Sequence, residues 1–213
     1  MIYCMSDIHG DMDRYTKMLE KIQFGPEDTM YIIGDVIDRH PDGIPILLDI
    51  MARDNIVLLM GNHEWMMLNE VVLGLPGATE RWNRNGAQPT RDALNALPEE
   101  ECNRLINFVL DLPDQLKIEV KERKYLLVHA WPAKERYERI WDRSIQNNPK
   151  PPLKECTVII GHTPVMYVTN DWEHPPKILH LPGIIDIDCG CAQSKDERVL
   201  GCLRLDDMAE FYV

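Results

Sequence analysis

Short apolar segments that end abruptly in polar residues recur along this chain of 213 residues. Apolar runs of this length fit buried strands better than they fit helices. The five segments are Ile2–Met5, Met30–Ile33, Ile56–Met60, Tyr125–Val128 and Val158–Ile160. We therefore predict five strands, each followed by a loop that carries polar side chains.

Helical patterns fill the intervals between the first of these segments. The residues from Asp11 to Ile22 place their apolar side chains on one stripe, and similar patterns run over Ile44–Met51 and Trp65–Leu73. Alternation of strand and helix is the signature of the α/β class. The first part of the chain is therefore predicted to build a sheet with helices packed against it.

The pattern changes in two places further along the chain. Residues 74–116 predict a mainly helical excursion between sheet strands, placed where it would cover a site. After Pro175 short strands return without a strong helix, and we expect them to complete a second sheet: Ile178–Leu181, Ile184–Ile187, Val199–Leu205 and Glu210–Val213. No repeat or long linker separates these parts, so we expect a single domain over residues 1–213.

Composition and charge narrow the possible partners. No apolar run approaches the ~20 residues that span a bilayer, and the N-terminus lacks the basic start and cleavage site of a signal peptide. We therefore expect a cytoplasmic protein with no membrane partner. The net charge of −12 opposes binding to nucleic acid or to an anionic membrane, because both select for clustered Lys and Arg. A site for a phosphorylated ligand would need local positive charge from metal ions or a few arginines.

The six cysteines include no C-x-x-C pair, and we interpret them as reduced core residues. Cys189 and Cys191 stand two positions apart, so in a strand they would share one face. A redox pair or a pair of thiolate ligands remains the alternative there.

The polar residues after the predicted strands include good metal ligands. Ligands of open α/β sheets gather beyond the carboxyl ends of the strands, where the loops converge. Carboxylate, amide and imidazole groups together suit Mn, Fe or Zn. Any one such residue is usually a turn or capping residue, but their recurrence in one chain favours a metal site. The candidate ligands are Asp7, His9, Asp35, Asn62, His129 and His162.

The order and spacing of these clusters resemble a known family, the calcineurin-like metallophosphoesterases. Within it the chain is most similar to the phosphoprotein phosphatases of the bacterial and phage-lambda type. The likeness runs from about residue 1 to residue 205 and rests on Ser6-Asp7-Ile8-His9-Gly10, Gly34-Asp35-Val36-Ile37-Asp38-Arg39, Gly61-Asn62-His63-Glu64, Val128-His129-Ala130, Trp141-Asp142-Arg143 and Gly161-His162-Thr163-Pro164. The resemblance implies a four-layer α/β/β/α sandwich with a dinuclear metal site at the carboxyl ends of the strands.

The resemblance also implies a role for each candidate ligand. Asp7 and His9 would hold a first metal ion, Asp35 would bridge to a second, and the second would take its remaining ligands from Asn62, His129 and His162. Two divalent ions are expected, with Mn preferred and Fe or Zn as alternatives. A hydroxide that bridges the ions would be the nucleophile, since paired metals lower the pKa of water towards neutrality.

Four further residues take catalytic roles from the same resemblance. His63 would protonate the leaving group and Asp38 would orient its ring, while Arg39 and Arg143 would grip the phosphate oxygens. The alternative for Arg39 is an ion pair with a neighbouring aspartate. Glu64 is expected to brace the helix that follows Asn62.

The implied activity is that of a metal-dependent phosphomonoesterase. The expected substrate is a phosphorylated protein or peptide, bearing phosphoserine, phosphothreonine or also phosphotyrosine. The alternative within the same fold is a hydrolase of dinucleoside polyphosphates or other small phosphorylated molecules. A non-catalytic scaffold is disfavoured because the ligands, the acid and both arginines are all retained.

Three residues depart from the family's pattern. Ser6 and His40 each replace a glycine, so the loop beside Arg39 is expected to differ in shape and His40 to border the site. Pro164 stands where many phosphodiesterase relatives have a second histidine. Since proline cannot coordinate a metal, the first ion is expected to have fewer protein ligands and to be the more labile.

Overall fold

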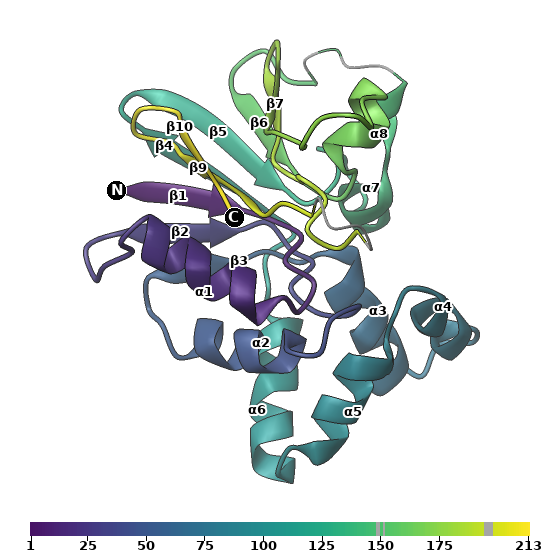
Figure 1. The fold of residues 1–213 in the computed structure, drawn as a ribbon. Coiled ribbons are helices and arrows are strands. Elements are labelled where there is room, and N and C mark those ends of the chain that lie inside the picture. The colour runs from purple at the N-terminus through teal and green to yellow at the C-terminus, as the bar shows by residue number, and fades with distance from the viewer. Residues whose placement is uncertain (148–149, 151, 194–197) are drawn as a thin grey trace.

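The computed structural model of this protein describes residues 1–147, 150, 152–193 and 198–213. Within these residues two mixed five-stranded sheets lie face to face, with helices on their outer faces (Figure 1). The first sheet has the strands, in spatial order, β10 (Ala209–Tyr212), β9 (Gly201–Arg204), β1 (Ile2–Met5), β2 (Thr29–Ile32) and β3 (Ile56–Leu58). The second has β4 (Gln115–Val120), β5 (Arg123–Val128), β6 (Thr157–Ile160), β8 (Ile184–Asp186) and β7 (Leu179–Leu181). The expected four-layer α/β sandwich is confirmed. The expectation that all the C-terminal strands complete the second sheet is wrong for β9 and β10, because β9 pairs with β1 in the first sheet and β10 pairs with β9.

Alternating side chains along the strands explain the layers. Successive residues of a strand point to opposite faces of its sheet. In β1, Cys4 packs in the core between the two sheets, whereas Tyr3 and Met5 pack in the core that includes the helices of the first layer. In β6, Ile159 packs between the sheets and Val158 and Ile160 face the outer side. β1 and β6 are apolar on both faces because both of their faces are buried.

The first helices follow the predicted pattern closely. They are α1 (Met12–Lys21), α2 (Gly43–Met51) and α3 (Asn62–Val71). Asp11 caps α1 by accepting the backbone N–H of Arg14, and Tyr15 and Met18 on its apolar stripe are buried in the core. Beside the second sheet lie three short helices that the hydrophobic pattern did not indicate: α7 (Arg136–Trp141), η1 (Ser144–Gln146) and α8 (Val165–Thr169).

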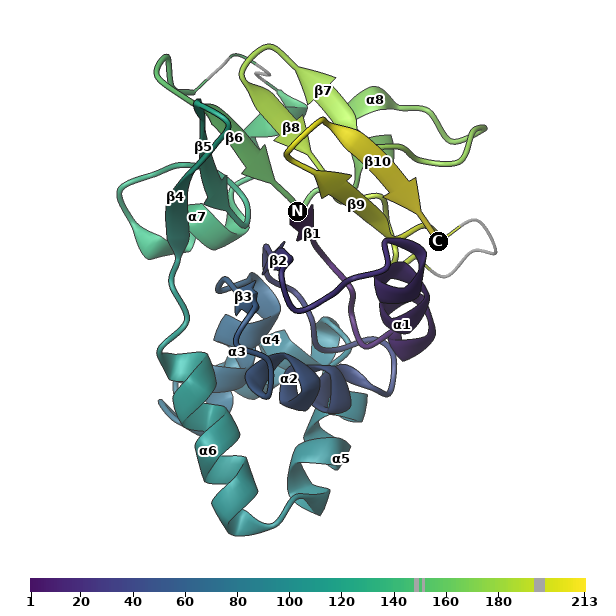
Figure 2. The ribbon, with the colours of Figure 1, turned by 90° about the vertical axis from the view of Figure 1, so that its left-hand side faces the viewer.

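The predicted helical excursion consists of α4 (Ala78–Arg84), α5 (Gln88–Ala96) and α6 (Glu99–Leu110). Figure 2 shows α5 and α6 projecting from the sheets as a pair. The excursion contacts α2 through α5 and α6, and contacts α3 through α4. Its predicted end at residue 116 overlaps β4, which begins at Gln115 and which the sequence pattern did not indicate. None of the described helices is long and apolar enough to cross a membrane.

Parallel pairing brings the important strand ends to one place. β1, β2 and β3 are mutually parallel in the first sheet, and β5, β6 and β8 are parallel in the second. The carboxyl ends of neighbouring parallel strands meet at one edge of a sheet, and the loops beyond them form the usual ligand site of such sheets. The clusters singled out in the sequence all follow these strands.

The cysteines are free thiols, as expected, and four of them are buried. The prediction that Cys189 and Cys191 share one face of a strand is wrong, because both lie beyond the end of β8. Cys189 packs between the sheets and Cys191 packs in the core on the helical side of the first sheet. Burial raises the pKa of both thiols. Neither the redox pair nor the pair of thiolate ligands is compatible with this arrangement.

Candidate metal centre

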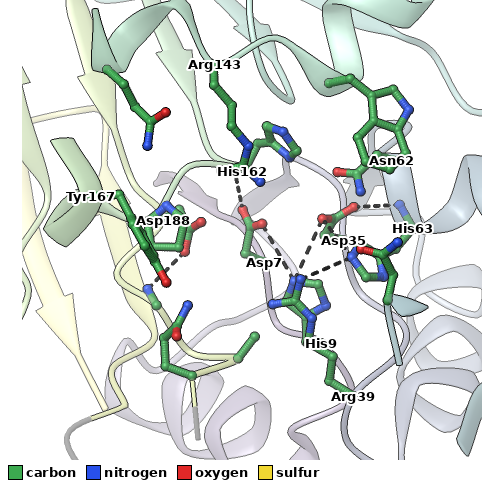
Figure 3. Close-up of a pocket in the computed structure, with 17 residues that line it drawn as sticks. Asp7, His9, Asp35, Arg39, Asn62, His63, Arg143, His162, Tyr167 and Asp188 are labelled. Carbon is green, nitrogen blue, oxygen red and sulfur yellow. Dashed lines mark hydrogen bonds and ion pairs between the residues drawn. The ribbon is translucent and has the colours of Figure 1, made fainter. Parts of the chain in front are cut away.

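A cavity of about 400 Å³ opens at the carboxyl ends of the strands (Figure 3). Eight of the ten predicted site residues line it, while His129 and Asp38 lie behind the lining. Each predicted metal ligand is at most 5% exposed, so the polar groups are held in a buried cluster. The residues drawn together are Asp7, His9, Asp35, Asn62, His129 and His162, together with His63, Asp38, Arg39 and Arg143.

The backbone at this edge is strained. Non-glycine residues with φ between about +50° and +70° are uncommon, and each such conformation costs about 1–3 kcal/mol. Aspartate and histidine adopt it more readily than most residues do. Six predicted site residues have positive φ: Asp7 (54°), His9 (49°), Asp35 (55°), Asp38 (73°), Arg39 (71°) and His162 (68°). Concentrated strain of this kind is a mark of functional loops, because the surrounding packing must hold it in place.

Two histidines are oriented by backbone carbonyl groups. The Nδ1 of His9 is 3.0 Å from the carbonyl oxygen of Ile37, and the Nδ1 of His129 is 2.7 Å from that of Ile33. A ring that donates from Nδ1 to a carbonyl presents Nε2 as its lone-pair nitrogen, which is the usual support of a metal-binding histidine. The two Nε2 atoms lie 3.7 Å and 3.3 Å from Oδ2 of Asp35. Asp35 therefore lies between the two rings, as the bridging position requires.

The donor atoms fit divalent metal ions. Nε2 of His162 is buried and has no hydrogen-bond partner, an arrangement that costs free energy unless the nitrogen binds something. Asp7 Oδ2 accepts the hydroxyl of Ser6 and the backbone N–H of His162, which leaves Oδ1 facing His9 at 3.8 Å. Asn62 Oδ1 lies 2.9 Å from Nε2 of His129. Imidazole nitrogens and carboxylate and amide oxygens so placed match a site for first-row divalent ions.

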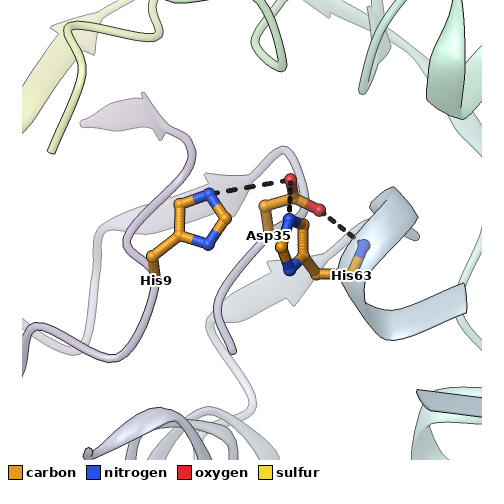
Figure 4. A group of neighbouring side chains, drawn as sticks. All are labelled: His9, Asp35 and His63. Atoms are coloured by element: carbon orange, nitrogen blue, oxygen red, sulfur yellow. Dashed lines mark hydrogen bonds and ion pairs between the residues drawn. The ribbon is translucent and has the colours of Figure 1, made fainter. Parts of the chain in front are cut away.

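Two groups of side chains have ligand atoms within 4.8 Å of one another. The first is His9, Asp35 and His63, shown in Figure 4, and the second is Asp35, His129 and His162. Asp35 belongs to both groups, which supports its predicted place between two ions. His63 is predicted to be an acid and not a metal ligand. Its Nε2 nevertheless lies 3.8 Å from Oδ2 of Asp35, within the first group.

The protonation of the cluster depends on burial and on neighbouring charges. Burial and neighbouring positive charges hold the pKa of His9 and of His162 well below the ordinary value, so both rings are neutral, as a metal-binding imidazole must be. For His129, burial lowers the pKa, but the charge of Asp35, the hydrogen bond to it, the charge of Asp7 and the carbonyl of Ile33 together outweigh burial and raise the pKa to about 10. Burial raises the pKa of Asp35, but the surrounding histidines hold it well below its ordinary value. Asp35 is therefore the anionic centre of the site.

His63 and Asp38 form a hydrogen-bonded pair. His63 Nδ1 donates to Asp38 Oδ2 at 2.6 Å, so Nε2 is directed towards Asp35 and the cavity. Burial lowers the pKa of His63, but the charge of Asp35 and the hydrogen bond to Asp38 raise it above the ordinary value. Arg39 Nη2 lies 3.3 Å from Nε2 and opposes protonation while it stays there.

Two residues of the helical excursion hold Asp38 in place, and sequence reasoning missed both. Trp82 in α4 donates its indole N–H to Asp38 Oδ2 at 2.8 Å. Thr90 in α5 donates its hydroxyl to Oδ1 at 2.6 Å and accepts the backbone N–H of Asp38 at 2.9 Å. The excursion also borders the cavity through Asn85. It therefore supports the acid pair from behind as well as forming part of the wall.

Glu64 caps α3, as expected, and it also braces the loop after β2. Glu64 is fully buried and its carboxylate accepts backbone N–H groups from Gly61, Asp35 and Val36 at 2.8–3.1 Å. Burial and the nearby Asp35 charge raise the pKa of Glu64 to about 7. Gly34 has φ +81°, and a Cβ atom there would lie 2.6 Å from Cα of Gly61. Only glycine allows the two loops to approach this closely.

The two arginines border the cavity and are exposed. Arg143 Nη1 lies 3.5 Å from the hydroxyl of Thr163, and Arg39 contacts His63. Within the described part of the chain neither guanidinium forms an ion pair, so the alternative proposed for Arg39 is not observed. Both cations are available to an anionic ligand.

The departures from the family's pattern are accommodated without loss of a predicted ligand. Ser6 is buried and its hydroxyl donates to Asp7. His40 does not line the cavity; its Nδ1 is 3.0 Å from the carbonyl oxygen of His9, and its Nε2 is 2.5 Å from Nη1 of Arg198. His40 thus contacts the backbone of a predicted ligand and does not border the cavity.

Comparison with known proteins decides the family. Residues 1–184 match the family model for the calcineurin-like phosphoesterases. The chain is a member of the calcineurin-like phosphoesterase family. This confirms the resemblance inferred from the motifs, and the members of that family are phosphoesterases that use divalent metal ions.

The relatives and structural neighbours of this chain have names that state different activities. A symmetrical bis(5'-nucleosyl)-tetraphosphatase from Erwinia tasmaniensis is 31% identical over 131 residues, which cover 60% of this chain and 43% of that protein. The chain thus spans less than half the length of that relative. Two solved structures share the fold: a protein serine/threonine phosphatase from Saccharomyces cerevisiae (14% identity, TM-score 0.61, covering 100% of this chain and 78% of that one), and a cold-active protein tyrosine phosphatase from Shewanella (17%, 0.56, 99% and 79%).

Sequence reasoning also missed a buried acid of this phosphoesterase. Asp188 lines the cavity, is 2% exposed and lies beyond the carboxyl end of β8. Burial and the charge of Asp7 raise its pKa well above the ordinary value. The signal was weak, since the predicted strand Ile184–Ile187 is interrupted by Asp186, whereas the segments that precede Asp7 and Asp35 are apolar throughout.

Proposed function

We propose that this phosphoesterase is a phosphomonoesterase that acts on phosphorylated Ser, Thr or Tyr residues of proteins or peptides, in the cytoplasm. Asp7, His9 and Asp35 would hold one divalent ion, and Asp35, Asn62, His129 and His162 the other. Mn suits this mixed imidazole and oxygen donor set, and Fe and Zn are the alternatives. When bound, the ions supply an activated water and polarise the phosphoryl group.

The hydrogen-bonded pair His63–Asp38 is the observation that carries this proposal. An alkyl monoester leaves as a strongly basic alkoxide and needs a proton at the departing oxygen. His63 is buried at the cavity wall, its ring is fixed by the 2.6 Å bond to Asp38, and its pKa is raised. A polyphosphate leaving group is far less basic and needs such an acid much less.

The arginines would bind the substrate. A guanidinium offers paired donors that match two phosphate oxygens, and neither Arg39 nor Arg143 has a carboxylate partner among the described residues. When Arg39 turns from Nε2 of His63 to a phosphate oxygen, Nε2 is free to carry the proton for the leaving group. Substrate binding and the charging of the acid are therefore coupled in this proposal.

A second candidate is a hydrolase of dinucleoside polyphosphates. It is favoured by the symmetrical tetraphosphatases among the relatives of the chain. The aromatic rings of Trp141 and Tyr167 also line the cavity and offer planar surfaces to a nucleobase.

Replacing His63 by asparagine tests the proposal. H63N should keep both metal ions and lower kcat by about 10²–10⁴-fold on a phosphoserine peptide. The loss on p-nitrophenyl phosphate should be small, because p-nitrophenolate leaves without a proton. Asp38→Asn should show a milder form of the same selectivity. The matched control is His174→Asn, a surface histidine that lies away from the metal ligands.

Three outcomes would contradict this assignment. Loss of one metal ion in H63N would make His63 a ligand, in keeping with its position near His9 and Asp35. Equal impairment on both substrates, with chemistry limiting the rate, would remove the acid role. Faster turnover of diadenosine tetraphosphate than of any phosphopeptide by the wild-type protein would establish the second candidate in place of the first.

A further inference from the structure

Asp188 is a buried acid of the cavity to which the resemblance gives no role. Figure 3 shows it beside Asp7, on the side away from Asp35. It lines the cavity and is 2% exposed. Its chain segment follows β8, which is parallel to β6, so Asp188 reaches the same edge of the sheets as the predicted metal ligands.

The position of Asp188 is fixed by hydrogen bonds on three of its groups. Its Oδ1 accepts the backbone N–H of Gly190 at 2.9 Å, and its own N–H donates to Asp186 Oδ1 at 3.1 Å. Its carbonyl oxygen accepts the N–H of Val165 at 2.9 Å, which ties it to the first residue of α8. These three hydrogen bonds hold the carboxylate in the cavity wall and restrict its rotation.

A charged Asp188 has no neutralising partner within the described part of the chain, in keeping with its raised pKa. Among the residues that the structure describes, no Lys, Arg or His side chain forms an ion pair with it. A buried carboxylate without a cation is costly, and next to a bound phosphate it would repel the substrate. The arginines of the cavity leave this charge unpaired, because Arg39 contacts His63 and Arg143 contacts Thr163. A cation from outside the chain would remove both costs.

The first metal site is the place where such a cation is expected. Its predicted protein ligands are Asp7, His9 and Asp35, and Pro164, which also lines the cavity, supplies none. The residue after Pro164 donates its N–H to the carbonyl of Asp188, so the acid stands next to the turn that lacks a ligand. Two divalent ions also carry more positive charge than the carboxylates of Asp7 and Asp35 balance.

We propose that Asp188 is an additional acidic residue of the first metal site, whose carboxylate stabilises the ion on the side where Pro164 offers no ligand. The inference rests on the metal centre of the proposed function and is independent of which phosphoester is the substrate. On this proposal the first ion is held more tightly than expected from the sequence, because a third carboxylate strengthens that site. The second site, with its ligands Asn62, His129 and His162, lies beyond Asp35 and should not depend on Asp188.

Titration of metal-free protein with Mn²⁺, followed by electron paramagnetic resonance and calorimetry, tests this proposal without any substrate. Asp188→Asn keeps the shape of the side chain and its acceptor for Gly190. It should bind one Mn²⁺ as the wild type does and the other about 10–100-fold more weakly, the usual effect of losing such a supporting group. Asp186→Asn is the matched control, since Asp186 is a buried acid of the same segment that does not line the cavity. It should bind both ions within about twofold of the wild type.

Thermal unfolding separates this role from a structural one. Metal-free D188N should unfold at or above the wild-type temperature, because no favourable ion pair is lost, and saturating Mn²⁺ should raise its unfolding temperature by less than that of the wild type. Two ions bound by D188N as tightly as by the wild type would overturn the proposal. Equal weakening in D186N would overturn it too, since the effect would then be a distant charge effect. A metal-free D188N that unfolds well below the wild type would make Asp188 a structural residue.

Discussion

Replacing Trp82 by phenylalanine tests whether the helical excursion supports the proposed acid. Trp82 is fully buried, and its indole N–H donates to Asp38 Oδ2 at 2.8 Å. The same oxygen accepts from His63 at 2.6 Å. W82F keeps an aromatic ring in the core but leaves a buried carboxylate without one of its donors.

The expected loss follows from that one hydrogen bond. A hydrogen bond to a charged group contributes about 1.5–3 kcal/mol, and at this chain length 1 kcal/mol shifts the unfolding temperature by about 2–4 °C. Metal-free W82F should therefore unfold about 3–12 °C below the wild type. Since Asp38 then orients His63 less well, kcat on a phosphoserine peptide should fall by about tenfold, a part of what a positioned acid contributes. Turnover of p-nitrophenyl phosphate should change little.

Trp65→Phe is the matched control. Trp65 is half-buried in α3 and stacks with Arg136, and among the described residues no carboxylate accepts its indole N–H. W65F should show little of either effect. In an Asp38→Asn background W82F should cost much less than in the wild type, because the two residues act through one contact. If W82F and W65F have the same unfolding temperature and the same kcat on phosphoserine, the excursion does not support the acid.

Three further predictions concern the metals, and a fourth concerns the stability of the metal-free protein. Chelated protein should be inactive, and Mn²⁺ should restore monoesterase activity better than Mg²⁺; full activity after exhaustive chelation would contradict the metal centre. Asp35→Asn should lose most activity and one metal equivalent, whereas two tightly bound ions by elemental analysis would refute the bridge. The pKa of His129 is raised to about 10, so in metal-free protein its ring holds a proton that a metal ion must displace. The affinity for Mn²⁺ should therefore rise from pH 6.5 to pH 9, and binding should release a proton. Calorimetry in buffers of different ionisation enthalpy measures both. The raised pKa of His129 also stabilises the metal-free fold: this stabilisation is complete below about pH 6.5 and is lost as the pH rises through about 10. An unfolding temperature of the metal-free protein that stays constant from pH 6.5 to 10 would argue against a charged His129.

The strand ends were predictable because each buried apolar strand is followed directly by polar residues of the site. β1 and β6 are apolar on both faces, since both sheets are covered on both sides, and each stops where polar ligands begin. Glycines such as Gly34 and strained acids such as Asp35 belong to the same short segment as the strand. A local pattern was therefore sufficient to find most of the centre.

The residues that were missed depend on contacts between distant parts of the chain. Trp82 and Thr90 reach Asp38 across 44 and 52 positions, and within their own helices they have the pattern of ordinary packing residues. Asp188 follows a segment of the predicted kind, but only the pairing of β8 with β6 brings that segment to the site. Helices as short as α8, with five residues, give too little periodicity to be seen in the sequence.

The distribution of the proposed ligands along the chain has a consequence for synthesis on the ribosome. Asp7, Asp35 and their neighbours come early, whereas His129 and His162 come from the second sheet. β1 also needs β9, which begins at Gly201, as its antiparallel neighbour. A nascent chain can therefore neither close its first sheet nor assemble the second metal site until most of it has emerged, so metal loading is expected to follow translation rather than accompany it.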